Sequence, residues 1–189
     1  MKQRLFIALD PTEDLRQEIV DLQSRLEKLR LPVLFQPAEK LHLTLNFLGA
    51  VDESAVGNLG AAVRTATSGI SSFSLTPAFL ETLYQKHDNS IIYLGFSGDI
   101  SHLKNLQSEL KKYLADLHFA QPKRFLPHIT IGKFKKTDPV LTKSYMDQIR
   151  DFDFYPLSAF IIDHVILYES LLSKAGSHFR RLRRFPLTA

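Results

Sequence analysis

The sequence predicts an α+β fold of two similar lobes, and a hidden repeat supports this class. A strand, a helix and a second strand follow one another twice, and each second strand carries a His-x-Thr motif. Phe6 and His42 are 36 positions apart (42 − 6), and Tyr93 and His128 are 35 positions apart (128 − 93). We therefore expect a single domain over residues 1–189, with two lobes of antiparallel sheet, helices outside and a central cleft.

The first copy begins with the apolar residues 5–9, which are typical of a buried strand. Asp10 then offers an N-cap, with Pro11 at the first helical position and Glu13 three residues after the cap. In the helix that follows, apolar residues step by four and three along one core-facing stripe: Leu15, Ile19, Leu22, Leu26 and Leu29. We expect this helix to end before Pro32.

The strand that completes the first copy alternates with period two over residues 41–47. Leucine and phenylalanine occupy one face, whereas His42, Thr44 and Asn46 occupy the other. By this parity Phe47 belongs to the core. Asn46 shares the polar face, where it would lie on the surface or orient a ligand.

The second copy begins with a strand over residues 90–96, and either Asp99 or Ser101 can cap the helix after it. The stripe of that helix is Leu103, Leu106, Leu110 and Leu114. Residues 127–131 then repeat the motif, with His128 and Thr130 on one face. Other elements expected are a helix at 52–67, a strand at 73–80, a polar turn at 85–89 and a long strand at 159–168.

Composition restricts the function classes. The chain has 189 residues, 44% hydrophobic and 23% charged, and no cysteine, which excludes disulfides, thiolate zinc sites and cysteine nucleophiles. The apolar residues 5–9 are too short for a signal peptide, and no run approaches the roughly 20 residues of a membrane span. We therefore expect a cytoplasmic protein, not bound to a membrane, and a monomer by default.

Positive charge favours an anionic partner. The net charge is +4, and residues 174–184 contain five basic side chains and no acidic one. Such a segment can follow a phosphate backbone, although a solvated basic tail explains it equally well.

Two His-x-Thr strands that face one cleft can perform acid–base chemistry. Imidazole has an ordinary pKa of about 6.5, so one ring can accept a proton while the other donates one. The hydroxyls of Thr44 and Thr130 can donate hydrogen bonds to phosphate oxygens. In-line displacement at phosphorus needs groups on opposite sides, and His42 and His128 would supply them. A strained 2′,3′-cyclic phosphate suits this arrangement.

Two segments carry a specific resemblance. "LHLTLNFLGAVDE" and "RFLPHITIGKF" resemble the paired HxTx motifs of the bacterial and archaeal RNA 2′,3′-cyclic phosphodiesterases, also called 2′-5′ RNA ligases, within the two-histidine (2H) phosphoesterase superfamily. The opening "RLFIALDP" and the closing "LYESLLSKAGSHFRRLRRFPL" are similar to the first and last segments of that family. The resemblance thus covers essentially the whole chain and implies the 2H phosphoesterase fold.

The resemblance also implies an activity and its residues. The reaction would be hydrolysis of a 2′,3′-cyclic phosphate end of RNA, or of a cyclic nucleotide, to a 2′-phosphomonoester, with no metal or other cofactor. By position His42 would be the proton donor and His128 the proton acceptor, while Thr44 and Thr130 would hold the phosphate. From the residues alone, the two histidines are equivalent.

Lys133 departs from the family pattern, because many relatives place an arginine there to bind phosphate. Lysine keeps the charge but loses the bidentate fork. Strict alternation puts Lys133 on the face opposite His128, so it reaches the site only if the strand is interrupted at Gly132. The resemblance also leaves open a second role for Phe47, because an aromatic residue near this position in relatives could stack on a base.

Other readings remain. The remaining histidines are expected to be structural: His87, His102, His118, His164 and His178. Within the enzyme class, the alternative is a 2′-5′ RNA ligase or 2′-5′ phosphodiesterase, and in another class it is a non-catalytic RNA- or nucleotide-binding module. A metallohydrolase is the weaker contender, since two histidines without convergent carboxylates make a poor metal site.

Overall fold

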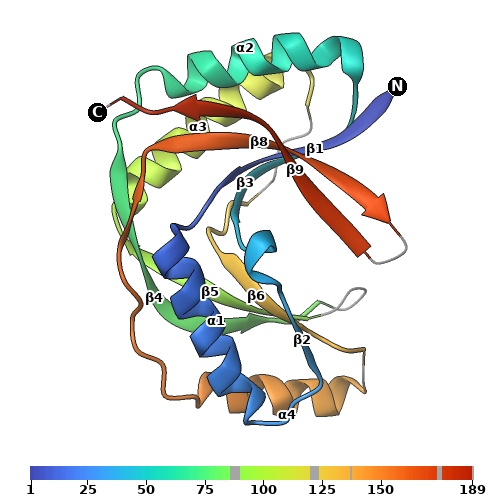
Figure 1. Ribbon diagram of the computed structural model, residues 1–189, viewed down its shortest axis with the longest axis vertical. Coiled ribbons are helices and arrows are strands. Elements are labelled where there is room, and N and C mark those ends of the chain that lie inside the picture. Colours follow the sequence, from blue (N-terminus) through green and yellow to red (C-terminus); the bar gives the residue numbers. More distant parts are fainter. Residues whose placement is uncertain (86–89, 120–123, 137, 174–175, 189) are drawn as a thin grey trace.

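The computed structural model describes residues 1–85, 90–119, 124–136, 138–173 and 176–188. In these residues nine strands form one antiparallel sheet, in the order β7-β4-β5-β6-β3-β1-β8-β9, with β2 beside β6 (Figure 1). The strands are β1 Lys2–Leu9, β2 Val33–Phe35, β3 Leu43–Asp52, β4 Phe73–Leu83, β5 Ile91–Gly98, β6 Ile129–Phe134, β7 Phe160–Ile162, β8 His164–Ser173 and β9 Gly176–Pro186. The helices are α1 Glu13–Glu27, α2 Val56–Thr67, α3 Ile100–Asp116 and α4 Pro139–Arg150, with short 3-10 helices η1 Ala38–Lys40 and η2 Glu53–Ala55.

The two predicted lobes are the two halves of this one sheet. One half contains β3, β1, β8 and β9, and the other contains β6, β5, β4 and β7. The halves meet where β3 pairs with β6, at Leu43 and Ile129. Each half takes its third strand from the segment that follows the other repeat: β8, which comes after the second copy, pairs with β1, and β4, which comes after the first copy, pairs with β5. The expected fold class is therefore confirmed, with the lobes joined by a continuous sheet.

The prediction of one long strand over residues 159–168 is wrong. The segment forms two strands that are separated at Asp163. β7 pairs with β4 in one half of the sheet, whereas β8 pairs with β1 in the other. The segment thus crosses from one lobe to the other, which requires a break in its pairing.

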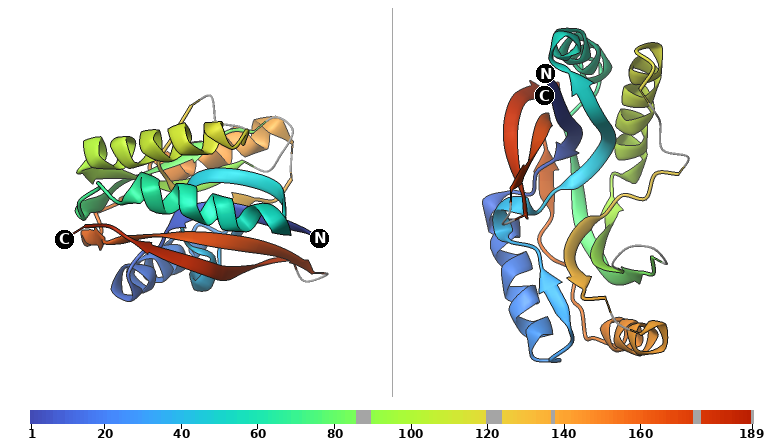
Figure 2. Two further views of the ribbon diagram at one scale, coloured as in Figure 1. Left: turned by 90° about the horizontal axis from the view of Figure 1, so that it is seen from above. Right: turned by 90° about the vertical axis from the view of Figure 1, so that its right-hand side faces the viewer.

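Helices cover the outer face of the sheet. The predicted stripes of α1 and α3 are buried in one core that spans both halves: Leu15, Ile19, Leu22, Leu26, Leu103, Leu106, Leu110 and Leu114. Leu29 lies beyond the end of α1 and packs against this core from a partly buried position. α2 and α3 lie side by side (Figure 2). None of the helices in the described segments is long and apolar enough to cross a membrane.

A second, smaller cluster lies on the other face of the first half. It contains Phe6, Ala8, Ile166 and Tyr168, with Phe179 packed against it. β1 is therefore buried on both faces, since Leu5, Ile7 and Leu9 belong to the main core. This explains why residues 5–9 are apolar without alternation.

The predicted N-cap of α1 is wrong. Thr12 caps the helix, and its Oγ1 accepts a hydrogen bond of 3.4 Å from the backbone N–H of Leu15. Asp10 does not cap because its carboxylate accepts hydrogen bonds from the Tyr168 hydroxyl at 2.7 and 2.6 Å. The local pattern assigns Asp10 to the helix end, but its contact with Tyr168 prevents it from capping the helix.

Candidate active site

The two His-x-Thr motifs cross at the junction of the two lobes. Leu43 and Ile129 are antiparallel partners, and both side chains are buried in the main core. Extended by one residue each way, this register sets His42 beside Thr130 and His128 beside Thr44. These four polar residues occupy the face opposite Leu43 and Ile129, because successive side chains of a strand alternate. The convergence expected from the internal repeat is therefore present.

The two imidazoles are held in the same way. Nδ1 of His42 lies 2.6 Å from the carbonyl oxygen of Lys40, and Nδ1 of His128 lies 2.7 Å from that of Leu126. A carbonyl only accepts, so in both rings Nδ1 carries the hydrogen and donates it. In the neutral form of each ring, Nε2 is then the nitrogen that carries no hydrogen. The two rings thus share one tautomer and one backbone contact, as the pseudo-symmetry predicts.

The electrostatic surroundings of His42 favour its neutral form. Burial lowers the pKa of His42 most strongly, and electrostatic interactions with His128 and Arg16 lower it further. The Lys40 carbonyl and the carboxylate of Asp10 act in the opposite direction. A phosphate in the cleft would add negative charge beside the ring and raise the pKa of His42.

The expectation that Phe47 belongs to the core is wrong. Its side chain is 71% exposed, while Asn46, expected on the polar face, is buried. In β3 the pairing shifts, so that Leu45 and Asn46 both lie opposite Ile7 of β1. This β-bulge moves Phe47 to the face that carries Thr44.

A matching bulge lies in β6 and decides the position of Lys133. Ile131 and Gly132 both lie opposite Ile92, as the pairing shifts after Thr130. The Ile131 carbonyl accepts two hydrogen bonds of 2.9 Å, from the backbone N–H of Gln36 and from Nε2 of Gln23. The predicted interruption at Gly132 is thus present, and Lys133 turns toward the face of Thr130.

Lys133 and Phe47 line the same hollow as His42. This cavity has a volume of about 530 Å³, and Arg4 and Phe179 are also among its walls. Its lining combines two cations, three phenylalanine rings and one imidazole, which fits an anionic ligand that carries a planar group.

Aromatic rings surround both histidines. The centroid of the His42 ring lies 5.1 Å from that of Phe6 and 5.2 Å from that of Phe179, the latter edge to face. In the second lobe Tyr93 lies 5.5 Å from His128, also edge to face. These contacts restrict the orientation of each imidazole.

Sequence reasoning missed Phe179 and Tyr93 as neighbours of the site. Tyr93 could have been found by extending the repeat, since Phe6 and Tyr93 occupy equivalent strand positions. Phe179 could not, because nothing in the pattern of a basic segment shows that β9 pairs with β8 and places this ring beside Tyr168.

None of the remaining histidines that the structure describes lines the cavity of His42. His102 stacks on Phe73, and His178 is exposed on β9. His118 follows the end of α3 with a φ of 61°. His164, expected to be packed in a strand, is the partly buried first residue of β8; it contacts the Asp163 carboxylate and lies 3.0 Å from Nη2 of Arg184. His87 and Lys174 fall outside the described residues.

The described segments bring together no group of three or more histidine and carboxylate side chains that could hold a metal ion. The described part of the basic C-terminal segment forms strand β9, where Arg180, Arg181 and Arg184 pair with acidic side chains but remain largely exposed to solvent.

Comparisons with known proteins agree with this geometry. The sequence model of the 2′-5′ RNA ligase superfamily matches residues 11–173. The "RNA 2′,3′-cyclic phosphodiesterase" of Thermotoga maritima is 29% identical over 179 residues, which cover 95% of this chain and 92% of the relative. A protein of the same name from Methanocaldococcus jannaschii is 25% identical over 182 residues, covering 96% and 99%.

Among solved structures, E. coli LigT complexed with 3′-AMP has the same fold. The TM-score is 0.80 at 22% identity, and the match covers 100% of both chains. Since the superfamily model spans most of the sequence and both motifs lie inside the matched range, the chain belongs to the 2′-5′ RNA ligase superfamily.

Proposed function

We propose that the protein hydrolyses 2′,3′-cyclic phosphate ends of RNA, or nucleoside 2′,3′-cyclic phosphates, to 2′-phosphomonoesters without a metal. The observation that carries this proposal is the antiparallel crossing of two His-x-Thr motifs at Leu43 and Ile129. The names of the relatives from Thermotoga maritima and Methanocaldococcus jannaschii support the same substrate.

The proposed step divides one displacement between the two rings. Nε2 of His128 accepts a proton from water as the water oxygen attacks phosphorus. The bond from phosphorus to the 3′ oxygen breaks on the opposite side, and Nε2 of His42 gives its proton to that oxygen. The product carries a 2′-phosphate and a 3′-hydroxyl. His42 then regains a proton from solvent and His128 loses one, so the enzyme returns to its starting state.

The surrounding side chains provide the binding of the phosphate. The hydroxyls of Thr44 and Thr130 donate hydrogen bonds to the non-bridging oxygens, one from each lobe. Lys133 adds a positive charge from the same cavity wall as His42. These contacts stabilise the charge of the pentavalent transition state and leave both imidazoles for proton transfer.

A general acid must carry a proton, whereas the ligand-free surroundings lower the pKa of His42. The negative charge of the bound phosphate resolves this conflict, because it favours the imidazolium form as the substrate arrives. Protonation of His42 and substrate binding are therefore coupled.

A product assay tests the function. Purified protein is incubated with nucleoside 2′,3′-cyclic phosphates in EDTA, and the phosphomonoester formed is identified. We expect the 2′ isomer, and we expect His42→Ala and His128→Ala each to lower kcat by about 10²–10⁴. His102→Ala serves as the matched control, because this ring lies at the start of α3, apart from the motifs.

The outcomes separate the alternatives. Joining of RNA strands with little hydrolysis would favour a 2′-5′ ligase. Binding of the cyclic nucleotide with no turnover by the unaltered protein would favour a non-catalytic module, and loss of turnover in EDTA would contradict the metal-free mechanism.

A further inference from the structure

A buried ion pair lies directly behind His42. Asp10 and Arg16 have side chains that are only 7% and 9% exposed, and Nη2 of Arg16 lies 3.5 Å from Oδ2 of Asp10. The same carboxylate accepts hydrogen bonds from the Tyr168 hydroxyl and from Nη2 of Arg181, the latter at 2.7 Å. Arg181 also donates to the Tyr168 hydroxyl at 3.1 Å. Asp10 is therefore fixed by three partners from α1, β8 and β9.

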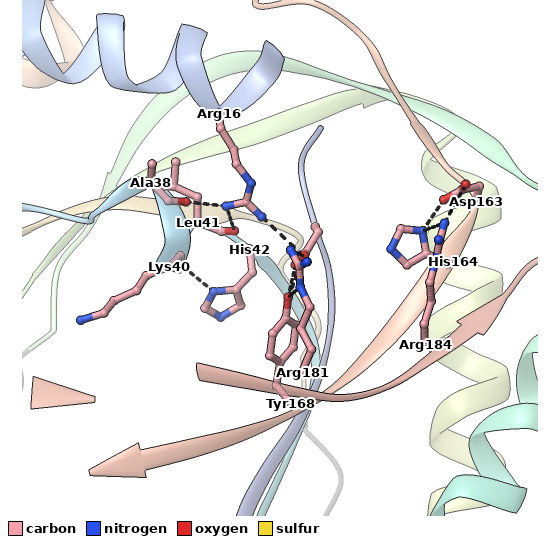
Figure 3. A network of polar contacts seen from close by, with 11 residues as sticks. Arg16, Ala38, Lys40, Leu41, His42, Asp163, His164, Tyr168, Arg181 and Arg184 are labelled. Carbon is pink, nitrogen blue, oxygen red and sulfur yellow. Dashed lines mark hydrogen bonds and ion pairs between the residues drawn. The ribbon is translucent and has the colours of Figure 1, made fainter. Parts of the chain in front are cut away.

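The other end of Arg16 holds the backbone that leads into the first motif. Its Nη1 donates to the carbonyl oxygens of Ala38 and Leu41, the latter at 3.1 Å (Figure 3). Lys40 lies between Ala38 and Leu41 in the sequence. Its carbonyl oxygen accepts the hydrogen bond from Nδ1 of His42. One guanidinium thus fixes both ends of the short segment that orients the catalytic ring.

Among the residues that the structure describes, no such brace starts from the equivalent helix position in the second lobe. When Leu15, Leu22 and Leu26 of α1 are aligned with Leu103, Leu110 and Leu114 of α3, Arg16 corresponds to Lys104. The Lys104 side chain is exposed. The pseudo-symmetry that relates the two histidines is therefore broken at Arg16.

We propose that Arg16, anchored by Asp10, is a positioning residue that fixes the orientation of His42 and makes it chemically different from His128. This inference rests on the proposed function. Positioning within a few tenths of an ångström matters for proton transfer, and a displacement of about 1 Å can lower a rate roughly 10²-fold. A planar fork that donates to two carbonyls cannot be reproduced by the single ammonium of lysine.

The network also acts on the charge of the ring. Asp10 raises the pKa of His42 and Arg16 lowers it. Asp10→Asn should therefore lower the pKa of His42, whereas Arg16→Met should raise it. Other charged or titratable groups face the His42 cavity or the network from the elements packed there, namely His128, Lys133, Arg4, Tyr168 and Arg181.

The experiment measures kcat and KM with a nucleoside 2′,3′-cyclic phosphate, together with the titration of the His42 imidazole by NMR. Arg16→Lys keeps the charge and removes the fork, and we expect kcat to fall about 10- to 100-fold while KM changes less than about threefold. Arg25→Lys is the matched control, because Arg25 lies on the same helix and also donates to a backbone carbonyl, that of Asp153 at 2.9 Å. We expect its kinetic constants to match those of the unaltered protein.

Asp10→Asn and Arg16→Met should shift the titration of His42 in opposite directions. The titrations of both variants are measured at a temperature below their thermal unfolding midpoints. A variant that fails to fold is therefore recognised separately. The inference is overturned if Arg16→Lys has the kcat of Arg25→Lys, or if the two variants shift the titration in the same direction or not at all. Absence of turnover in the unaltered protein would instead contradict the proposed function, and the NMR titration would still test the positioning role.

Discussion

The burial of His42 has a consequence for stability. Its pKa is lowered in the folded protein, mainly by burial, so between that value and the ordinary value near 6.5 the unfolded chain binds a proton that the folded chain does not. The contribution of His42 to stability is therefore complete above pH 6.5 and is lost as the pH falls. We predict that the unfolding free energy decreases from pH 7 toward pH 5, measured in urea, and that this decrease is smaller in His42→Gln. An unchanged dependence on pH in His42→Gln would contradict this role of His42.

Phe47 is the residue whose position differs most from the expectation, and its position indicates a role. The ring is 71% exposed beside His42 and lies 6.3 Å from the ring of Phe6. Stacking of a base on an aromatic ring contributes about 1–3 kcal/mol. We predict that Phe47→Ala raises KM for a nucleoside 2′,3′-cyclic phosphate roughly tenfold, with little change in the unfolding midpoint. Tyr155, which is 60% exposed outside the cavity, provides the control as Tyr155→Ala. An equal effect of the two changes would contradict a stacking role.

At the scale of elements, a bulge in each central strand places the side chains that strict alternation would direct away from the cleft. Beyond the bulge of β6, Lys133 reaches the cavity of His42. We predict that Lys133→Ala raises KM about tenfold at low salt, and that the difference shrinks as salt screens the charge. Lys133→Arg should lower KM below that of the unaltered protein, because the fork can bind two phosphate oxygens. Lys135→Ala, two residues further on and exposed, is the control; if it matches Lys133→Ala, a specific phosphate contact is excluded.

The same bulges show how far the sequence could predict the site. Period-two alternation located His42, Thr44, His128 and Thr130 on one face, since each motif lies before its bulge. It failed at Phe47, because a bulge is set by the pairing with β1 and by no feature of the local pattern. The cap at Asp10 failed for a related reason, since its partner Tyr168 lies 158 residues away. Local sequence patterns thus predicted the helices and strands. The positions that differ from the prediction depend on contacts between residues that are distant in sequence.

At the scale of the whole molecule, the internal repeat predicted the two lobes but not how they are joined. Each lobe contains a strand from the segment that follows the other repeat, because β8 pairs with β1 and β4 pairs with β5. Neither repeat can form its half of the sheet alone. The cleft is therefore a property of the complete fold, and the relative position of His42 and His128 depends on the stability of both halves.

This exchange predicts that the protein unfolds in one cooperative transition. Leu22 of α1 comes from the first repeat and Leu110 of α3 from the second. Both side chains are buried in the main core that spans the sheet. Leu22→Ala and Leu110→Ala should each lower the unfolding free energy by about 2–5 kcal/mol and shift the same single transition. Leu172→Ala, at an exposed position of β8, should change it by less than about 0.5 kcal/mol. The measurement is urea unfolding followed by circular dichroism and by tyrosine fluorescence. Two separate midpoints, one shifted by each core variant, would show that the lobes fold independently and that the shared strands do not couple them.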